Sequence, residues 1–390
     1  MRRIKQTVQS VLEPLDIQID GRRPWDLRVH NPEFYKRVLS GGSLALGESY
    51  MERWWDCDAL DQFFEKILEN RFDRKIRSNR ALLWEILKTR LKNAQTRNRA
   101  FIVARRHYDI GDDLFRMMLD KWLNYSCGYW HNAETLDQAQ EAKLHLICRK
   151  LGLQPGMTVL DIGCGWGGFA KFAAMHYRVR VKGVTVSRKQ IAFAREFCKN
   201  LDVQIELCDY RDLYEPFDRV VSIGMFEHVG WRNYRTFMSV VHRCLKKNGI
   251  FLLHTIAGNT SVTATDPWID KYIFPNSMMP SASQISEAAE GLFLLEDWHS
   301  FGPYYDKTLM VWFDNFTKNW KSIKGMYDQT FYRMWTYYLL LCAASFRARR
   351  NQLWQIVFSK GGMRQVFCHK ADFSHDTVSR REESCQAACS

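Results

Sequence analysis

The sequence predicts an α/β protein in which a doubly wound sheet follows a smaller helical N-terminal domain. Three observations lead to this fold class. The apolar run 159–162 ends at a glycine cluster over 163–168, which is typical of a buried strand that turns directly into a helix. After residue 157, short apolar runs alternate with helical patterns, as in parallel sheets with helices on both faces. Residues 1–120 show helical periodicity without such a glycine cluster.

The length of 390 residues leaves room for two domains. We expect a helical domain over residues 1–120, an α/β domain over 121–370 and a disordered polar tail over 371–390. A helix is expected over 136–151, and further helices are expected to start near Gly167, Ser187 and Trp231. A cap is expected over 258–290. The expected strands are 157–163, 180–186, 203–208, 218–224, 249–256, 292–298 and 353–358.

The glycine turn predicts a cofactor site. Gly163, Gly165 and Gly168 have the G-x-G-x-x-G spacing that dinucleotide sites also use, but an acid that would bind a ribose is missing from the end of the second strand. That strand ends in hydroxyl residues instead. Asp161 precedes the turn, where a carboxylate can bind the amino group of a cationic amino-acid cofactor. This favours S-adenosylmethionine over NAD, and therefore a transferase over a dehydrogenase. A turn that binds nothing is disfavoured, because clustered glycines are entropically costly.

The net charge of +13 is concentrated in one segment. Residues 71–106 hold twelve Lys or Arg and two acids, interleaved with apolar and aromatic side chains. This pattern favours an amphipathic element on an anionic membrane surface over a nucleic-acid reader, although a solvated helical face remains an alternative. The first residues lead into no apolar signal segment, so we expect a cytoplasmic protein that is soluble or peripheral on the membrane.

The eleven cysteines show no zinc-ligand spacing, so we predict reduced thiols and no metal site. Four other segments supply groups that can carry chemistry. Glu227 follows an apolar run and is expected to be a partly buried, paired carboxylate that acts as a base or orients a ligand, or else ties down a turn. His254 ends an apolar strand, where a structural role is equally expected. Cys127 and Tyr305 taken alone favour simple packing.

With these residues in view, the chain resembles the cyclopropane-fatty-acyl-phospholipid synthases, which are relatives of the mycolic acid cyclopropane synthases. The similarity runs from about Asn31 to Lys360. The glycine turn is shared by many methyltransferases, whereas Phe-Glu-His-Val-Gly together with Tyr-Ser-Cys is much narrower. The stretches that carry the resemblance are 47–56, 106–109, 125–127, 159–168, 183–187, 225–230, 254–256, 266–269 and 296–299.

The resemblance implies a Rossmann-like methyltransferase sheet and methylene transfer from S-adenosylmethionine to the cis double bond of a phospholipid acyl chain. It also implies a bound bicarbonate that serves as base, with ligands matching Cys127, Glu227, His254, the backbone of Ile256 and Tyr305. Cys342, which the pattern alone predicts to be buried and inert, matches a cysteine once proposed as catalytic in the family. The expected cofactor-binding residues are Tyr125, Ser126, Asp161, Gly163, Cys164, Gly165, Gly167, Thr185, Ser187, Gln190, Asp209 and Tyr210.

The expected partner is therefore an anionic phospholipid bilayer with unsaturated acyl chains, with no nucleic acid. A homodimer is a family expectation only. Two alternatives stay open: an S-adenosylmethionine-dependent N- or O-methyltransferase of another substrate, and a membrane-binding module without catalysis. Loss of turnover without loss of cofactor binding in Glu227→Ala would separate the first alternative from the leading hypothesis. Vesicle binding without cofactor affinity would favour the second.

Overall fold

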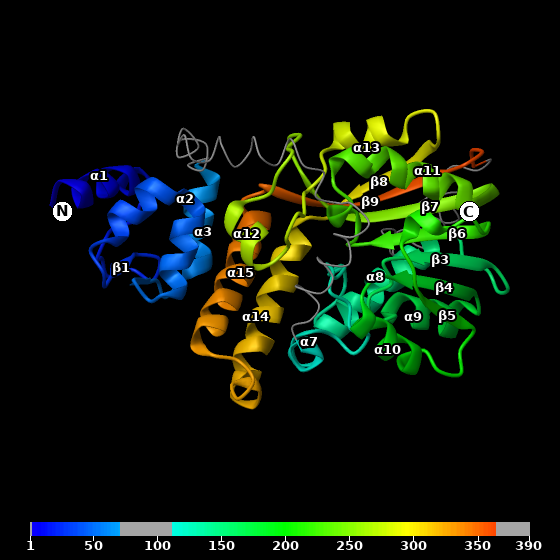
Figure 1. Cartoon of the computed structure of the whole chain (residues 1–390), viewed down its shortest axis with the longest axis horizontal. Coiled ribbons are helices and arrows are strands. Elements are labelled where there is room, and N and C mark those ends of the chain that lie inside the picture. Colours follow the sequence, from blue (N-terminus) through cyan, green and yellow to red (C-terminus); the bar gives the residue numbers. More distant parts are fainter. Residues whose placement is uncertain (1, 71–110, 364–390) are drawn as a thin grey trace, which may run out of the picture.

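The computed structural model describes residues 2–70 and 111–363. The basic segment 71–106 and the tail 371–390 therefore lie outside the described residues. Helices at one end of the molecule lead into an α/β layer structure at the other (Figure 1). The helices are α1 (Arg2–Leu12), α2 (Phe34–Met51), α3 (Leu60–Glu69), α7 (Asp112–Met118), α8 (Leu136–Lys150), α9 (Gly168–Tyr177), α10 (Arg188–Phe197), α11 (Tyr234–Cys244), α12 (Pro267–Tyr272), α13 (Ala282–Ala289), α14 (Pro303–Ile323) and α15 (Gln329–Arg347).

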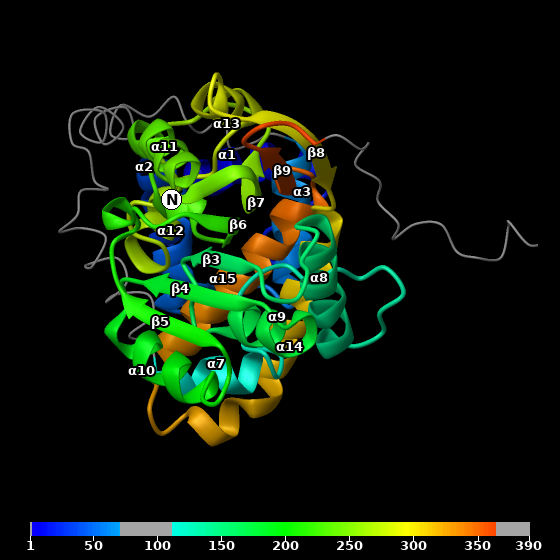
Figure 2. The same cartoon turned by 90° about the vertical axis from the view of Figure 1, so that its right-hand side faces the viewer.

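The main sheet has seven strands in the order β5-β4-β3-β6-β7-β9-β8 (Figure 2). Strands β3 to β7 pair in parallel, as the alternating pattern predicts. The last strand, β9, instead inserts between β7 and β8 and pairs with both in antiparallel fashion, so the sheet is mixed. The strands are β3 (Thr158–Ile162), β4 (Arg180–Thr185), β5 (Val203–Leu207), β6 (Phe217–Ile223), β7 (Leu245–Gly258), β8 (Leu294–Ser300) and β9 (Asn351–Ser359), and a separate two-stranded sheet joins β1 (Arg28–Val29) to β2 (Trp55–Asp56).

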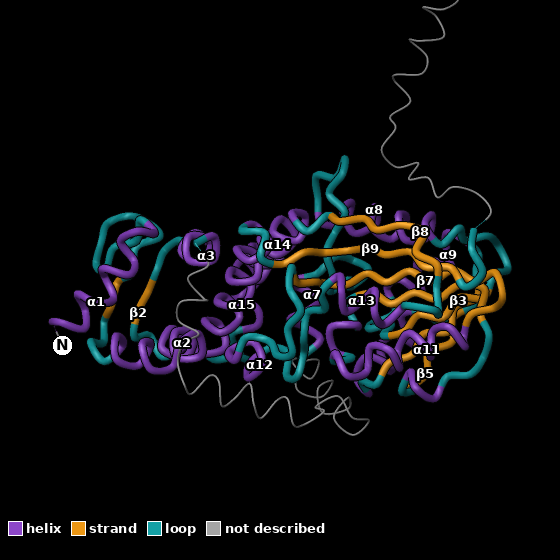
Figure 3. The backbone as a smooth tube through the Cα atoms, turned by 90° about the horizontal axis from the view of Figure 1, so that it is seen from above, coloured by secondary structure: helices purple, strands orange, loops and turns teal. Residues whose placement is uncertain are grey.

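Helices cover both faces of the main sheet, with α8 and α9 on one side and α11 and α13 on the other (Figure 3). Local sequence signals set where these helices begin. Thr135 caps α8 in a capping box with Gln138, and Ser281 caps α13 in the same way with Gln284. The predicted cap over 258–290 contains α12 and α13.

The N-terminal helices share their hydrophobic core with the C-terminal helical hairpin formed by α14 and α15. Trp55 and Phe63 are fully buried in the same cluster of side chains as Trp312, Trp335 and Tyr337. Two other core clusters lie on the two faces of the sheet. The boundary at residue 120 stays a prediction. No helix within residues 2–70 and 111–363 has the length and hydropathy needed to span a membrane.

Candidate active site

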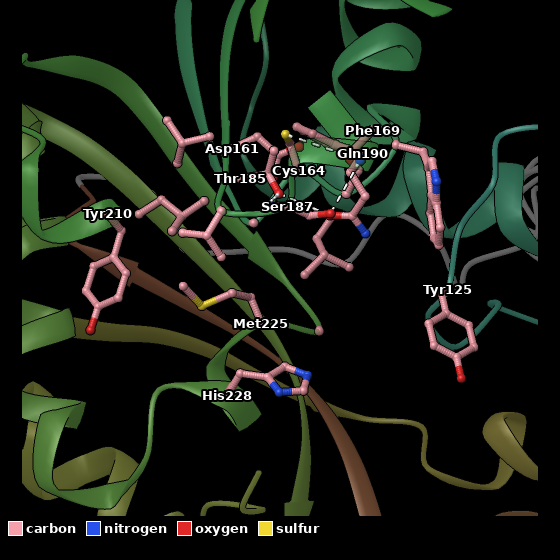
Figure 4. A pocket seen from close by; sticks show the side chains of 18 of the residues that line it. Tyr125, Asp161, Cys164, Phe169, Thr185, Ser187, Gln190, Tyr210, Met225 and His228 are labelled. Carbon is pink, nitrogen blue, oxygen red and sulfur yellow. Dashed lines mark hydrogen bonds between the residues drawn. The ribbon is translucent and has the colours of Figure 1, made fainter. Parts of the chain in front are cut away.

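A cavity lies beyond the carboxyl ends of β3, β4, β5 and β6, where parallel sheets place their ligands. We call it the strand-end cavity. Figure 4 shows Asp161, Thr185 and Ser187 on one side of it, with Tyr125 and Tyr210 on opposite flanks. Of the twelve predicted cofactor-binding residues, the following eleven line it: Tyr125, Ser126, Asp161, Gly163, Cys164, Gly165, Thr185, Ser187, Gln190, Asp209 and Tyr210.

The glycine turn leaves room for a ligand at one position only. Gly165 has φ +55°, and a Cβ built on it would meet no protein atom within 4 Å. By contrast, a Cβ on Gly163 would lie 2.7 Å from the Met225 side chain. Gly167 does not line the cavity; its Cβ position faces the Cys198 sulfur, 3.0 Å away, so this glycine serves helix packing. Gly165 is therefore the place where backbone can approach a cofactor closely.

Asp161 carries a buried carboxylate that faces the strand-end cavity. Its side chain is 2% exposed, and burial raises its pKa to about 7. It has neither a hydrogen-bonding nor an ion-pair partner among the residues the structure describes. A carboxylate in such a place gains most from a cationic ligand, so the residues present fit the ammonium group of an amino-acid cofactor.

The hydroxyl pair at the end of β4 is organised by the start of α10. The Ser187 N–H donates to Thr185 Oγ1 at 3.1 Å, Thr185 Oγ1 donates to Gln190 Oε1 at 3.0 Å, and Ser187 Oγ accepts from the Gln190 N–H. Asp209 is tied down differently, because its carboxylate accepts from the Arg211 guanidinium at 2.6 and 2.8 Å. The cavity wall is thus pre-ordered by hydrogen bonds within the chain.

A second group of predicted residues lies outside the lining of the strand-end cavity: Cys127, Glu227, His254 and Tyr305, which we call the buried cluster. Glu227 is its most constrained member. Its Oε1 accepts the Ile256 N–H at 2.5 Å, whereas Oε2 is buried without a hydrogen-bonding partner among the described residues. Burial raises the pKa of Glu227 to about 7, against the lowering effect of hydrogen bonds from the backbone and from the Thr255 hydroxyl. Its carboxyl group can therefore hold or release a proton near neutral pH.

His254 is fixed from β9. Gln355 Nε2 lies 3.3 Å from His254 Nδ1, and donation from that amide places the ring proton on Nε2. Nε2 is buried and has no partner in the described part of the chain. Burial, with Lys143 and Lys150 nearby, holds the pKa of His254 well below its usual range. His254 is therefore a neutral imidazole with a donor to offer.

Cys127 and Tyr305 complete the buried cluster as neutral donors. The Cys127 thiol is fully buried and donates to the Gly128 carbonyl at 3.2 Å, and burial raises its pKa. Tyr305 stands in the first turn of α14; burial raises its pKa, as do the neighbouring Cys127, Tyr125 and Glu227. Cys342 on α15 keeps part of its residue surface exposed, but its thiol is enclosed by protein, and this burial raises the pKa of the thiol to about 12.

Aromatic rings connect the strand-end cavity to the buried cluster. Tyr125 lines the cavity and packs on Trp312 with ring centroids 5.1 Å apart. Trp312 in turn meets the Tyr305 ring edge-on at 5.9 Å. The Tyr125 and Tyr338 hydroxyls share a hydrogen bond of 2.7 Å. A reactive group bound between Tyr125 and the buried cluster would therefore be surrounded by aromatic side chains, which exclude water.

Trp166, Met225 and His228 line the strand-end cavity but were not predicted to bind the cofactor. His228 is fixed in the 3-10 turn after β6, its Nδ1 is buried without a partner in the structure as described, and burial lowers its pKa to about 4. The signal was present in the sequence, since Met225 and His228 flank Glu227 at a strand end. The titratable carboxylate of Glu227 was the stronger candidate at that strand end.

Comparisons with known proteins agree with this geometry. The model of the family "Mycolic acid cyclopropane synthetase" matches residues 95–356. The chain is similar to cyclopropane-fatty-acyl-phospholipid synthase of Escherichia coli K12, with 53% identity over 352 residues, covering 90% of this chain and 92% of that protein. A probable fatty acid methyltransferase of Pseudomonas putida is 34% identical, covering 71% and 72%.

Solved structures give the same result. The cyclopropane synthase MmaA2 of Mycobacterium tuberculosis matches with a TM-score of 0.64 and 33% identity, covering 69% of this chain and all of that one. Mycolic acid cyclopropane synthase CmaA1, solved with SAH and CTAB, matches with a TM-score of 0.62 and 35% identity, covering 67% and 98%. Coclaurine N-methyltransferase, at 22% identity and a TM-score of 0.68, shares the fold. The match of the family model over two thirds of the sequence and the high identity over nine tenths of it establish that this chain belongs to the mycolic acid cyclopropane synthetase family.

Proposed function

We propose that this chain is an S-adenosylmethionine-dependent cyclopropane-fatty-acyl-phospholipid synthase, which transfers a methylene to the cis double bond of an unsaturated acyl chain. One observation carries the proposal. A cavity with an unpartnered carboxylate, Asp161, is joined through Tyr125 and Trp312 to a cluster in which buried polar atoms of Glu227 and His254 lack partners within the described residues. An ordinary methyltransferase needs the first feature but not the second.

The residues of the strand-end cavity do the binding. S-adenosylmethionine, when bound, supplies an electrophilic methyl group on a sulfonium. Asp161 would accept hydrogen bonds from the cofactor's ammonium group, and Gly165 would allow the backbone to approach the cofactor closely. Tyr125 and Trp312 exclude water from the side on which an alkene would approach, because a carbocation formed there would otherwise be captured by water. Holding the reactants in line is an entropic contribution from the same residues.

The buried cluster is proposed to hold a bicarbonate, the base for the proton lost on ring closure. Support comes from the donor set. His254 Nε2, the Cys127 thiol and the Tyr305 hydroxyl are neutral donors, and Glu227 Oε2 can take a proton. Ile256 contributes indirectly. Its N–H donates a hydrogen bond to Glu227 Oε1 and so fixes the position of the carboxylate. A small oxyanion of this kind would satisfy Glu227 Oε2 and His254 Nε2, which are buried without partners among the described residues.

The setting of the reaction is proposed from the substrate and the sequence. A phospholipid acyl chain is reached at a bilayer, and the twelve basic residues of segment 71–106 suit its anionic headgroups. We therefore propose peripheral attachment to the inner membrane face, with the N-terminal helical part as docking element. A homodimer is proposed from the family resemblance.

The direct test is incubation of the full-length protein with S-adenosylmethionine and vesicles of unsaturated phosphatidylglycerol and phosphatidylethanolamine. Lipid mass spectrometry is expected to show the addition of one methylene to each modified chain. Saturated lipid is the matched control and is expected to stay unchanged. Protein that binds the cofactor but leaves the mass of unsaturated lipid unchanged would overturn the proposal. Omitting the anionic lipid tests the membrane part separately, and is expected to lower the rate without abolishing turnover.

A further inference from the structure

Lys143 is a lysine on α8 that no motif singled out, yet its side chain is fully buried. Its Nζ donates to Ser126 Oγ at 2.8 Å. The neighbouring Gln140 donates from Nε2 to the Ser126 carbonyl, also at 2.8 Å. Helix α8 thus holds the Tyr125–Ser126–Cys127 loop from behind. The Ser126 hydroxyl accepts from Lys143, so its own proton is free to be donated elsewhere.

Lys143 has no carboxylate within ion-pair distance among the described residues, and the charge that acts on it most strongly is that of buried Asp120. Asp120 is already engaged, because its carboxylate accepts from the Trp122 N–H at 2.9 Å and from the Asn124 N–H at 2.8 Å. Burial lowers the pKa of Lys143 to about 8 despite Asp120.

Lys150, two turns further along α8, provides the comparison. It is also a buried lysine, but its Nζ contacts Asp297 Oδ2 at 3.0 Å and His299 Nδ1 at 3.2 Å. Lys150 therefore has a carboxylate in direct contact, whereas Lys143 contacts a hydroxyl and interacts with Asp120 without forming an ion pair. A buried ammonium that lacks a direct ion pair is costly, so Lys143 would be stabilised by an anion bound close to it.

The buried cluster lies where such an anion would bind. The charge of Lys143 acts both on the Cys127 thiol and on His254, which puts the lysine within electrostatic reach of both. We propose that Lys143 is a positioning residue of the anion site: its buried positive charge balances a small oxyanion bound at the buried cluster, and its hydrogen bond to Ser126 fixes the loop that carries Cys127. This rests on the oxyanion of the proposed function.

The test measures bicarbonate binding directly. The full-length protein, saturated with S-adenosylhomocysteine, is titrated with sodium bicarbonate against sodium chloride at equal ionic strength, and the thermal unfolding midpoint is followed. We expect a saturable rise in the wild type. In Lys143→Met the half-saturating concentration should rise roughly tenfold or more, since hydrogen bonds and contacts with a buried charge are of that strength. Lys150→Met is the control: Lys150 also acts on His254, but its charge is paired with Asp297, so the half-saturating concentration should stay within about twofold of the wild-type value.

A second variant separates anion binding from stability. Asp120→Asn combined with Lys143→Met removes the two opposite buried charges together, so Asp120 is not left without Lys143 if Lys143→Met alone folds poorly. The double variant should still show the raised half-saturating concentration. Wild-type bicarbonate affinity in this double variant would overturn the proposal. A wild type that modifies lipid but gains no thermal stability from bicarbonate would also overturn it and leave methylene transfer standing. If bicarbonate stabilises the wild type and Lys143→Met weakens this effect, but the wild type modifies no lipid, the role of Lys143 in anion binding is supported and the proposed function is overturned.

Discussion

The strand-end cavity and the buried cluster differ in how they are built. The cavity comes from strand ends that follow one another along the chain, and most of its polar groups are satisfied by neighbours, as in the Thr185, Ser187 and Gln190 set. The cluster gathers residues from four distant segments and leaves Glu227 Oε2 and His254 Nε2 without partners among the described residues. The difference indicates a division of labour: the cavity is made to bind, and the cluster is held ready for a further polar group.

Glu227→Gln is expected to have the largest effect on turnover, and it tests whether the strand-end cavity and the buried cluster have separate roles. It keeps the size of the side chain but removes its capacity to take a proton, so turnover should fall roughly 10²- to 10⁴-fold. Binding of S-adenosylhomocysteine, measured by calorimetry, should change less than about threefold, because Glu227 does not line the cavity. An equal loss of cofactor affinity would show that the two regions are one site.

Asp161→Asn is the reciprocal change and should weaken cofactor binding roughly tenfold to a hundredfold. In the wild type, the Asp161 carboxyl is protonated below its pKa of about 7, so cofactor affinity should fall as the pH drops below that value. Asp161→Asn should lose this pH dependence and Glu227→Gln should keep it. Calorimetric titrations from pH 5.5 to 8 measure both. A wild-type affinity that is flat over this range would contradict the assignment of Asp161 to the cofactor's ammonium.

The same carboxylate should cost stability in the absence of cofactor. Its pKa is raised from 3.8 to about 7 on folding, so between these values the native state holds a proton that the unfolded state has lost. The free energy of unfolding therefore decreases as the pH rises from about 4 to about 7. Asp161→Asn removes this term, and the ligand-free variant should be more stable than wild type above pH 7, by up to about 4 kcal/mol. Urea unfolding at pH 5 and pH 8 tests the sign.

The sequence is informative about the cavity because the cavity's signals are local. Glycines, strand ends and caps are read within about ten residues, and they predict the strands β3 to β7 and place the cofactor at the strand ends. The full set of cofactor-binding residues, Tyr125 and Ser126 among them, came from the family resemblance. The position of β9 between β7 and β8 could not be predicted, because pairing between distant segments leaves no local pattern. The sequence singles out Glu227, His254, Cys127 and Tyr305 separately, but their grouping into one anion site came only from a resemblance. Lys143 did leave a signal, since it and Lys150 are seven residues apart on one face of α8.

Arg347 on α15 links helix α3 to the start of α14, which carries Tyr305 of the buried cluster. Its replacement tests whether the buried cluster depends on this support while the strand-end cavity does not. Arg347 binds both oxygens of Asp306, next to Tyr305, at 2.9 and 3.0 Å, and also reaches Asp61 on α3 at 2.9 Å. Arg347→Met should lower the free energy of unfolding by roughly 1–3 kcal/mol, because the carboxylates of Asp61, Glu65 and Asp306 all lose this partner. Turnover should fall about three- to tenfold as Tyr305 loses its support, with cofactor affinity unchanged.

Arg37→Met is the matched control for Arg347→Met. Its guanidinium is equally exposed, at 26%, and pairs with Glu48 and Glu52, both away from Tyr305. We expect a loss of stability without the loss of turnover. If both variants slow turnover equally, Arg347 acts through general stability and not through α14.

Cys342→Ala is expected to have the smallest effect. Burial raises the pKa of this thiol to about 12, so it stays protonated at neutral pH and is a poor nucleophile. Its position on α15, partly exposed, contrasts with the fully buried Cys127 in the cluster. Turnover of Cys342→Ala should stay within about threefold of wild type, whereas Cys127→Ala, which removes a donor from the cluster, should lose more. Steady-state assays of the pair decide the point, and a reversed ranking would move the catalytic thiol from the Tyr125–Cys127 loop to α15.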